Sequence, residues 1–467
     1  MRQIQFSEGS IFRNILRSAL PMLAAQIINL LYNIVDRIYI GRIPGVGTVA
    51  LGAAGLCFSV IIFISAFTNM YGSGGAPLCS IERGRGRRAK AEEIMNVSCF
   101  LLVSTGLFIT AAGELAAEPV LRLLGASDTN LVFALPYLRI YLLGTVFSML
   151  ATGLNPYINA QGFAGAGMFT VVIGAVCNLL LDPVFIFVLG MGVRGAALAT
   201  VLSQGLSAAF VLRFLGGRQA ELRLRLMTPA DFLGHLDTAA DIVSLGLSSF
   251  VMSATNFLVS AACNNMLSGY GGDLYVSIMT VVSSVRQMLD TPVLAIGDGT
   301  SPVLSFNYGA RRPDNVRRSI LIMTILGVSY TLVSWLLLLW KPGLFIGIFT
   351  PDKELIRDAV PALHLYFFAF PFQALQISGQ TTFKALNKKK RAILFSIFRK
   401  VIIVVPLTIL LPGMFGMGVN GVFMAEPISN FVGGSASFTT MLLTILPELK
   451  RMEQDPLKGP GPDRDLS

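Results

Sequence analysis

The chain has 467 residues, of which 54% are hydrophobic and only 13% are charged. Because a soluble domain carries roughly 25% charged residues, this composition excludes a soluble globular protein and indicates a polytopic helical membrane protein. The net charge of +10 does not require a nucleic-acid partner. Most basic residues lie in short loops between apolar segments, where they set the orientation of membrane helices. We therefore expect membrane lipid around the chain and no nucleic acid.

Apolar segments long enough to cross a bilayer follow one another along the chain. The expected fold class is all-α, a polytopic membrane protein with about twelve transmembrane helices. These spans are expected at residues 12–40, 50–82, 94–117, 131–160, 166–190, 194–217, 239–267, 275–307, 316–341, 356–384, 391–414 and 419–446.

Basic residues gather in the loops after the second, sixth, eighth and tenth predicted spans, whereas the opposite loops are short and poor in Lys and Arg. The positive-inside rule then places both termini in the cytoplasm. We expect a multi-pass protein of the inner (plasma) membrane, acting as a monomer. The polar, proline-containing residues 451–467 are expected to form a disordered cytoplasmic tail.

Prolines and glycines recur at a nearly constant offset along the chain. Pro77 and Gly84 match Pro302 and Gly309, both 225 residues later. Two halves with an even number of spans have the same orientation, which is the arrangement of parallel repeats with a site between two lobes. The pattern predicts two pseudo-symmetric six-helix lobes, at residues 1–225 and 226–450.

The first predicted span carries a polar stripe inside an apolar run. Gln26, Asn29, Asn33 and Asp36 recur at helical spacing, so they share one helix face. A carboxylate in hydrocarbon costs roughly 3 kcal/mol or more, and such a group usually faces a wet cavity or a partner. Asp36 is therefore the first candidate functional residue.

Two further spans offer polar groups at a similar depth. Asn178 and Asp182 share a helix face directly before Pro183, and Thr200 lies early in the next span. At 1.5 Å per residue these groups and Asp36 lie roughly 6–12 Å below the outer surface. Their oxygens suit a hard monovalent cation or a proton held between two carboxyls. The structural alternative is a set of polar contacts between helices.

The second half lacks this set of residues. The counterparts of Asp36, Asn178 and Asp182 lie near Ala262, Val401 and Val405, and Thr200 is replaced by Glu426. Glu426 is either a second protonatable group or a structural one.

Three basic residues of the second half also lie inside predicted spans. Arg286 and Asp290 are four residues apart and are expected to neutralise each other. Arg399 and Lys400 are expected to extend their charged ends to the cytoplasmic surface, and a role in a cavity is the alternative.

The chain resembles the multidrug and toxic compound extrusion (MATE) transporters over about residues 10–446. The resemblance is carried by Leu31–Gly41, by Asn178-x-x-x-Asp182-Pro183 and by Gly195–Thr200. It implies a V-shaped, two-lobed transporter that exports organic cations in exchange for H⁺ or Na⁺. Asp36, Asn178, Asp182 and Thr200 match the family's cation site in the N-terminal lobe, and Tyr32 matches a position that lines the same cavity. The absence of acids at Ala262 and Val401 departs from branches with an ion site in the second lobe.

These observations predict a cation-coupled antiporter that exports small organic compounds, cationic and amphipathic, by rocker-switch alternating access. We expect no cofactor besides the coupling ion, and no metal site except one for Na⁺ at the four matched residues. An enzyme is not expected, because the chain has no Walker A loop and no His/Glu metal pair. The alternative is a flippase of a lipid-linked precursor; the acidic cavity of the first half argues against it, and Arg139 and Arg286 keep it open. The candidate substrate-cavity residues are Gln26, Asn29, Tyr32, Asn33, Arg286, Asp290 and Glu426.

Overall fold

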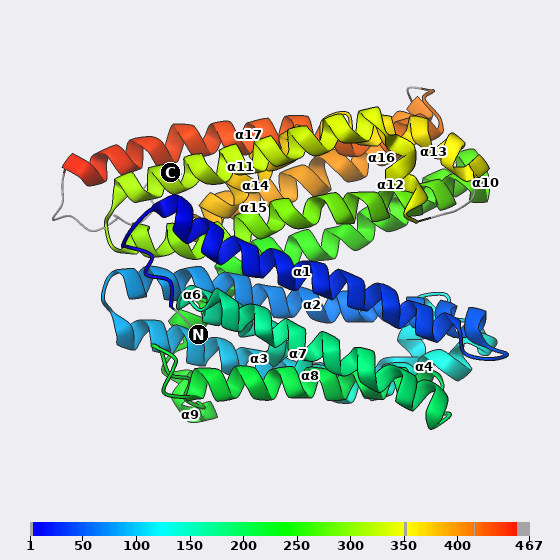
Figure 1. Cartoon of the computed structure of the whole chain (residues 1–467), viewed down its shortest axis with the longest axis horizontal. Coiled ribbons are helices and arrows are strands. Elements are labelled where there is room, and N and C mark those ends of the chain that lie inside the picture. The colour runs from blue at the N-terminus through cyan, green and yellow to red at the C-terminus, as the bar shows by residue number, and fades with distance from the viewer. Residues whose placement is uncertain (1–2, 350–352, 415, 455–467) are drawn as a thin grey trace. The chain divides into compact units, whose positions relative to one another are not determined.

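A computed structural model describes residues 3–349, 353–414 and 416–454, and these form helices and connecting turns without a strand (Figure 1). The first half contains α1 Ile11–Gly41, α2 Gly47–Gly84, α3 Arg88–Leu123, α4 Asp128–Leu143, α5 Thr145–Gly153, α6 Asn155–Ala160, α7 Ala164–Pro183, η1 Val184–Val188, α8 Val193–Gly216 and α9 Pro229–Leu233. The second half contains α10 Leu236–Gly309, α11 Pro313–Trp340, α12 Pro342–Gly347, α13 Lys353–Tyr366, α14 Pro371–Ala385, α15 Lys389–Ile397, η2 Phe398–Val404, α16 Val405–Met414 and α17 Val419–Gln454.

The predicted all-α membrane fold is confirmed. Within the described residues, 8 helices are long and apolar enough to cross a membrane, or 10 when each bent pair counts as one span. One bent pair joins α4 to the helices after it at 56°, and the other joins α13 to α14 at 50°. Two more predicted spans lie in long helices of more polar sequence, namely α17 and the part of α10 that follows the kink at Gly272.

The chain divides into two compact units that are interleaved in sequence. Unit 1 comprises residues 1–4, 20–79 and 88–254, and unit 2 comprises residues 5–19, 80–87 and 255–467. These bounds differ from the predicted boundary between residues 225 and 226. The division of the chain into two lobes at that boundary stays a prediction. The helix α17 continues to Gln454, so residues 451–454 of the predicted tail are helical. The rest of that tail lies outside the described residues.

Each unit has its own apolar interior. In unit 1, α7 packs against α8, and α5 packs against both α3 and α8. The core of unit 1 includes Leu102, Leu138 and Tyr157, all fully buried. In unit 2, α14 packs against α11 and α17, and α16 also packs against α17. Because these helices also expose many Leu, Ile and Phe side chains, their outer faces suit lipid rather than water.

The predicted internal repeat is visible where α2 and α10 meet in unit 2. A Cβ added at Gly84 would lie 2.1 Å from the carbonyl oxygen of Phe306, and one at Gly309 would lie 2.0 Å from that of Ile81. Ile81 precedes Gly84 by the same three positions by which Phe306 precedes Gly309. The contact is therefore reciprocal, and glycine at both positions lets the two backbones touch.

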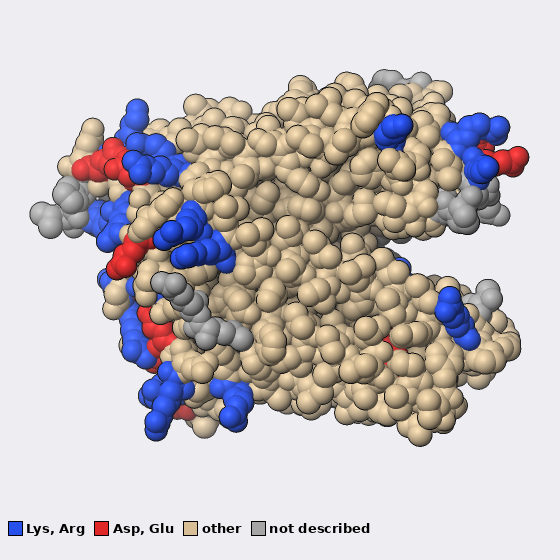
Figure 2. All heavy atoms as spheres, viewed as in Figure 1, with Lys and Arg blue, Asp and Glu red and all other residues tan. Residues whose placement is uncertain are grey.

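Charged side chains are distributed unevenly over each unit. On the face shown in Figure 2, most Lys and Arg gather at one end of the helices of each unit, and the flanks carry few charges. In unit 1 this end includes the start of α3 at Arg88 and the end of α8 at Arg213. In unit 2 it includes Arg317 in α11 and the start of α15 at Lys389. A multi-pass membrane protein has this charge pattern.

Candidate functional site

The four residues predicted to hold a cation converge within unit 1. The amide Nδ2 of Asn178 in α7 donates to Oδ1 of Asp182 at 3.3 Å and to Oγ1 of Thr200 in α8 at 3.3 Å. The side chains of Asp36 in α1 and Asp182 lie close enough to each other to interact electrostatically. Asp182 is fully buried, and Asn178 and Thr200 are nearly so.

Local backbone features bring α7 and α8 together at this point. Pro183 ends the regular α-helix, and the chain continues as the wider π-helical turn η1. A Cβ at Gly195 would lie 2.7 Å from the backbone carbonyl carbon of Phe185 in η1. Glycine at this position therefore allows the start of α8 to contact η1 closely, which sets Thr200 opposite Asn178.

The site contains more acceptors than donors. Oδ1 of Asp36, Oδ2 of Asp182 and Oδ1 of Asn178 are buried, and none accepts a hydrogen bond from an N–H or hydroxyl group of the described residues. Two carboxylate oxygens in contact repel each other unless a proton or a cation lies between them. The arrangement therefore suits one H⁺ or one Na⁺. No cluster of three or more His, Cys, Asp or Glu side chains that could hold a metal occurs in the described part of the chain.

Aromatic side chains surround the acidic pair. Tyr32 interacts electrostatically with Asp36 and Asp182, and its place in the lining of a cavity stays a prediction. Tyr137 of α4 interacts with Asp36 and with Tyr32, and Tyr141 lies beside them, also buried. Sequence reasoning missed Tyr137 and Tyr141. The available signal was a pair of tyrosines, four residues apart, that begins directly after Pro136 in a largely apolar span.

The remaining stripe residues of α1 contribute less directly. Nδ2 of Asn33 donates to the backbone carbonyl of Asn29 at 2.6 Å and contacts its side-chain oxygen at 3.5 Å. Asn29 is exposed, whereas Gln26 and Asn33 are half-buried. The stripe is thus present on one helix, and the bonds between Asn33 and Asn29 stay within α1.

Unit 2 contains a second buried polar cluster, which holds the other predicted substrate-cavity residues. Oε1 of Glu426 in α17 accepts from Arg286 of α10 at 2.6 Å and from Arg399 of η2 at 2.6 Å. Nζ of Lys400 lies 3.3 Å from the same oxygen. We call Arg286, Asp290, Arg399, Lys400 and Glu426 the charged cluster.

The expectation that Arg286 and Asp290 simply neutralise each other is incomplete. Nε of Arg286 donates to Oδ2 of Asp290 at 3.1 Å, so the pair exists. The same guanidinium also donates to the hydroxyl of Tyr366 at 2.8 Å and bonds to Glu426. Arg286 is therefore one member of a larger network.

The expectation that Arg399 and Lys400 reach the surface is wrong. Arg399 is 3% exposed and Lys400 is 7% exposed. Both lie in the π-helical turn η2, whose extra residue per turn changes which side chains face the interior. The guanidinium of Arg399 donates to Gln376, Gln373 and Asn430 at 3.2, 3.2 and 2.7 Å. A spacing of three between the two glutamines in an apolar span was the signal that sequence reasoning overlooked.

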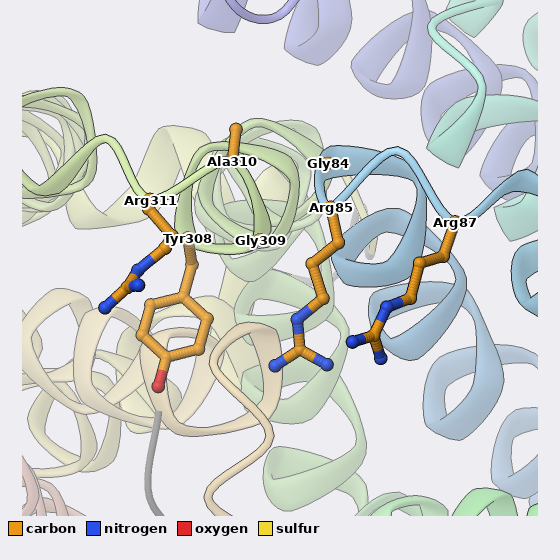
Figure 3. A pocket seen from close by; sticks show the side chains of 7 residues that line it. All are labelled: Gly84, Arg85, Arg87, Tyr308, Gly309, Ala310 and Arg311. Carbon is orange, nitrogen blue, oxygen red and sulfur yellow. The ribbon is translucent and has the colours of Figure 1, made fainter. Parts of the chain in front are cut away.

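A pocket of about 560 Å³ lies apart from both clusters, at the charged end of unit 2 (Figure 3). It is lined where α2 and α10 end, by Gly84, Arg85, Arg87, Tyr308, Gly309, Ala310 and Arg311. Arg85 pairs with Glu82 at 2.5 Å, and the hydroxyl of Tyr308 donates to Glu448 at 2.5 Å. Its position among loop arginines makes it part of the polar surface rather than of the membrane interior.

Arg139 does not contribute to a cationic cavity. Its side chain is 53% exposed, and its Nε lies 3.7 Å from a carboxylate oxygen of Glu114. Of the two basic residues that favoured a flippase, only Arg286 is part of a buried cluster in the described structure.

Solved structures share this fold. An outward-facing multidrug resistance MATE family transporter of the MOP superfamily superposes with a TM-score of 0.88 at 23% identity, covering 96% of this chain and 99% of the other. A MOP superfamily transporter from Pyrococcus furiosus, for which reverse polarity of the binding pocket suggests a different function, has the same TM-score, identity and coverage.

Sequence comparison identifies relatives and a family. The multidrug export protein MepA of Staphylococcus saprophyticus is 22% identical over 418 residues, which is 88% of this chain and 90% of that protein. The MatE family model matches residues 21–184 and again residues 248–410. These matches cover well over half of the chain, and the second repeats the first in the other half. The chain therefore belongs to the MatE family, the family of multidrug and toxic compound extrusion transporters.

Proposed function

We propose that this protein is an antiporter that exports small amphipathic organic compounds in exchange for H⁺ or Na⁺, by rocker-switch alternating access. The interaction between Asp36 and Asp182, whose buried oxygens Oδ1 and Oδ2 accept no hydrogen bond from the described residues, is the observation that carries this proposal. Two neighbouring carboxylates inside a membrane helix bundle repel each other, and an ion that neutralises them removes this repulsion. The chain is similar in sequence to a multidrug export protein over most of both lengths, and similar in fold to a multidrug resistance transporter. Both similarities support the export of organic compounds.

The coupling follows from competition for one site. An ion bound between Asp36 and Asp182 removes the charge that would attract a cationic part of a substrate. Asn178 and Thr200 hold Asp182 in place through the bonds already described. Ion entry from outside would therefore release the compound there, and ion loss to the cytoplasm would prepare the site for the next one.

The direct test is transport in proteoliposomes with Na⁺ and pH gradients imposed separately. We expect one gradient to drive uptake of ethidium into inside-out-oriented vesicles, and Asp36→Asn to abolish that uptake while the protein still elutes as a single peak. Val405→Asn, at the position of the second half that matches Asp182, is the control and should keep wild-type coupling. Uptake by Asp36→Asn at the wild-type rate would contradict the proposal.

The flippase alternative draws support from the charged cluster of unit 2, since a diphosphate group needs cationic partners. Vesicles containing a fluorescent polyprenyl diphosphate distinguish the two functions. Antiport predicts that the lipid stays in its original leaflet under either ion gradient, whereas a flippase would transfer it without a response to ethidium.

A further inference from the structure

The charged cluster of unit 2 is not electrically balanced. Arg286, Arg399 and Lys400 are three cations, and Glu426 and Asp290 are two carboxylates. One positive charge therefore has no counter-charge within the cluster. A net charge inside a membrane helix bundle is costly and usually marks an ion or substrate site.

The donors of the cluster are also incompletely used. Nε of Arg399 is buried and has no hydrogen-bond partner among the described residues, although the Arg399 side chain is only 4% exposed. An arginine donor left unpaired at such burial favours the approach of an acceptor. The rest of the guanidinium is held by Gln373, Gln376, Glu426 and Asn430, which fixes its orientation.

Arg286 and Asp290 form the accessible edge of the cluster. Their side chains keep 15% and 16% of their surface exposed, compared with 5% for Glu426. Asp290 contacts Arg286 through Oδ2 alone, and its Oδ1 is buried without a partner. Asp290 is thus a poor acceptor for a guanidinium that can bind two oxygens of one group in parallel.

We propose that the charged cluster binds an anionic oxygen group of carboxylate or phosphate type on the exported molecule, and that Asp290 occupies the place of this group on Arg286 in its absence. The inference deepens the proposed export function and rests on it. The excess positive charge provides the attraction, Arg286 provides the accessible donors, and Glu426 keeps the three cations together. The preferred compound then carries an acidic group besides its apolar body, in addition to the cationic and amphipathic character expected from the sequence.

Binding of two dyes that differ in a single group tests this site without requiring transport. Tetramethylrhodamine has a free carboxylate, and its methyl ester has the same ring system without that charge. Fluorescence anisotropy with the purified full chain in nanodiscs of phosphatidylcholine should give an affinity at least about tenfold higher for the acid than for the ester. Equal affinities, or a preference for the ester, would overturn the proposal.

Two substitutions at the edge of the cluster should act in opposite directions. Arg286→Gln should reduce the preference for the acid to about one, whereas Asp290→Asn should raise the affinity for the acid and should not raise that for the cationic ester. Arg286→Lys keeps the charge and should give an intermediate preference. If Asp290→Asn weakens binding of the acid while the ester still binds normally, Asp290 is not a substitute for the ligand and the proposal fails.

The source of the anionic group is resolved in the same assay. Nanodiscs that contain phosphatidylglycerol should weaken dye binding in the wild type, but not in Arg286→Gln, if a lipid phosphate occupies the cluster. Unchanged dye binding assigns the group to a carboxylate-bearing solute. A preserved preference for the acid without any ion-driven uptake would reject the proposed antiport and keep the anion site. Ion-driven uptake without that preference would reject the anion site and keep the proposed antiport.

Discussion

Glu426 is the residue whose removal should most strongly affect the stability of unit 2. Its Oε1 lies 2.6 Å from Arg286, 2.6 Å from Arg399 and 3.3 Å from Lys400, and the residue is 4% exposed. In Glu426→Gln the side-chain shape is kept, but three cations lose their shared counter-charge. Breaking a buried ion pair from one side costs about 3–5 kcal/mol. For a domain of about 200 residues this lowers the melting temperature by roughly 6 °C or more.

The assay is the melting temperature of purified protein in detergent, followed by tryptophan fluorescence or by loss of the monodisperse elution peak. Glu118→Gln is the matched control, because Glu118 pairs with Arg122 at 3.0 Å but is 47% exposed. A solvent-exposed pair contributes little to stability, so the control should melt close to the wild type.

A second substitution separates charge balance from packing. Lys400→Met in the Glu426→Gln background removes one of the three cations and keeps an unbranched side chain of similar length. It should recover part of the lost melting temperature, although Lys400→Met alone has a smaller effect. If Glu426→Gln melts within about 1 °C of the wild type, or if the second substitution lowers the melting temperature further, the electrostatic account of the cluster is wrong.

Three further outcomes are expected. Gly309→Val should prevent recovery of folded protein in size-exclusion chromatography, because its Cβ would lie 2.0 Å from the carbonyl oxygen of Ile81. The control is Gly55→Ala, whose added Cβ would have no atom within 4 Å, and it should elute as the wild type does. Thr200→Val should weaken ion-driven uptake about tenfold without abolishing it, since it removes one acceptor of Asn178 but neither acid, and the same flux assay checks this. Single cysteines replacing Arg87 and Lys390 should react with an impermeant maleimide only from the cytoplasm, and one replacing Asp128 only from outside; labelling of Arg87→Cys and Asp128→Cys from the same side would contradict the predicted orientation.

The convergence of Asp36, Asn178, Asp182 and Thr200 could be anticipated from sequence for a physical reason. In a membrane helix, spacing along the chain fixes both the face and the depth of a side chain. Residues at a similar depth on neighbouring helices therefore meet when the helices pack. The role of these residues in ion coupling is a prediction that the flux experiments test.

The arrangement of unit 2 was less predictable because it depends on a departure from regular helix geometry. The π-helical turn η2 leaves no mark in the apolar pattern, so a regular helix was assumed for Arg399 and Lys400. Their burial also requires Glu426 and the glutamines of α14, which are distant in sequence. Length and composition select 8 helices of the described residues as candidate spans, and neither α17 nor the part of α10 after Gly272 is among them.

The central claim is that Asp36 and Asp182 act as one ion-coupling unit. The measurement that tests it most directly is ion-driven uptake by the wild type, Asp36→Asn, Asp182→Asn and the double variant in one proteoliposome series. Groups that act as a unit are non-additive, so each single variant should lose as much coupled uptake as the double variant, while Val405→Asn keeps it. If the losses of the two single variants instead add up in the double variant, or if either single variant retains wild-type coupling, the two acids do not share one ion.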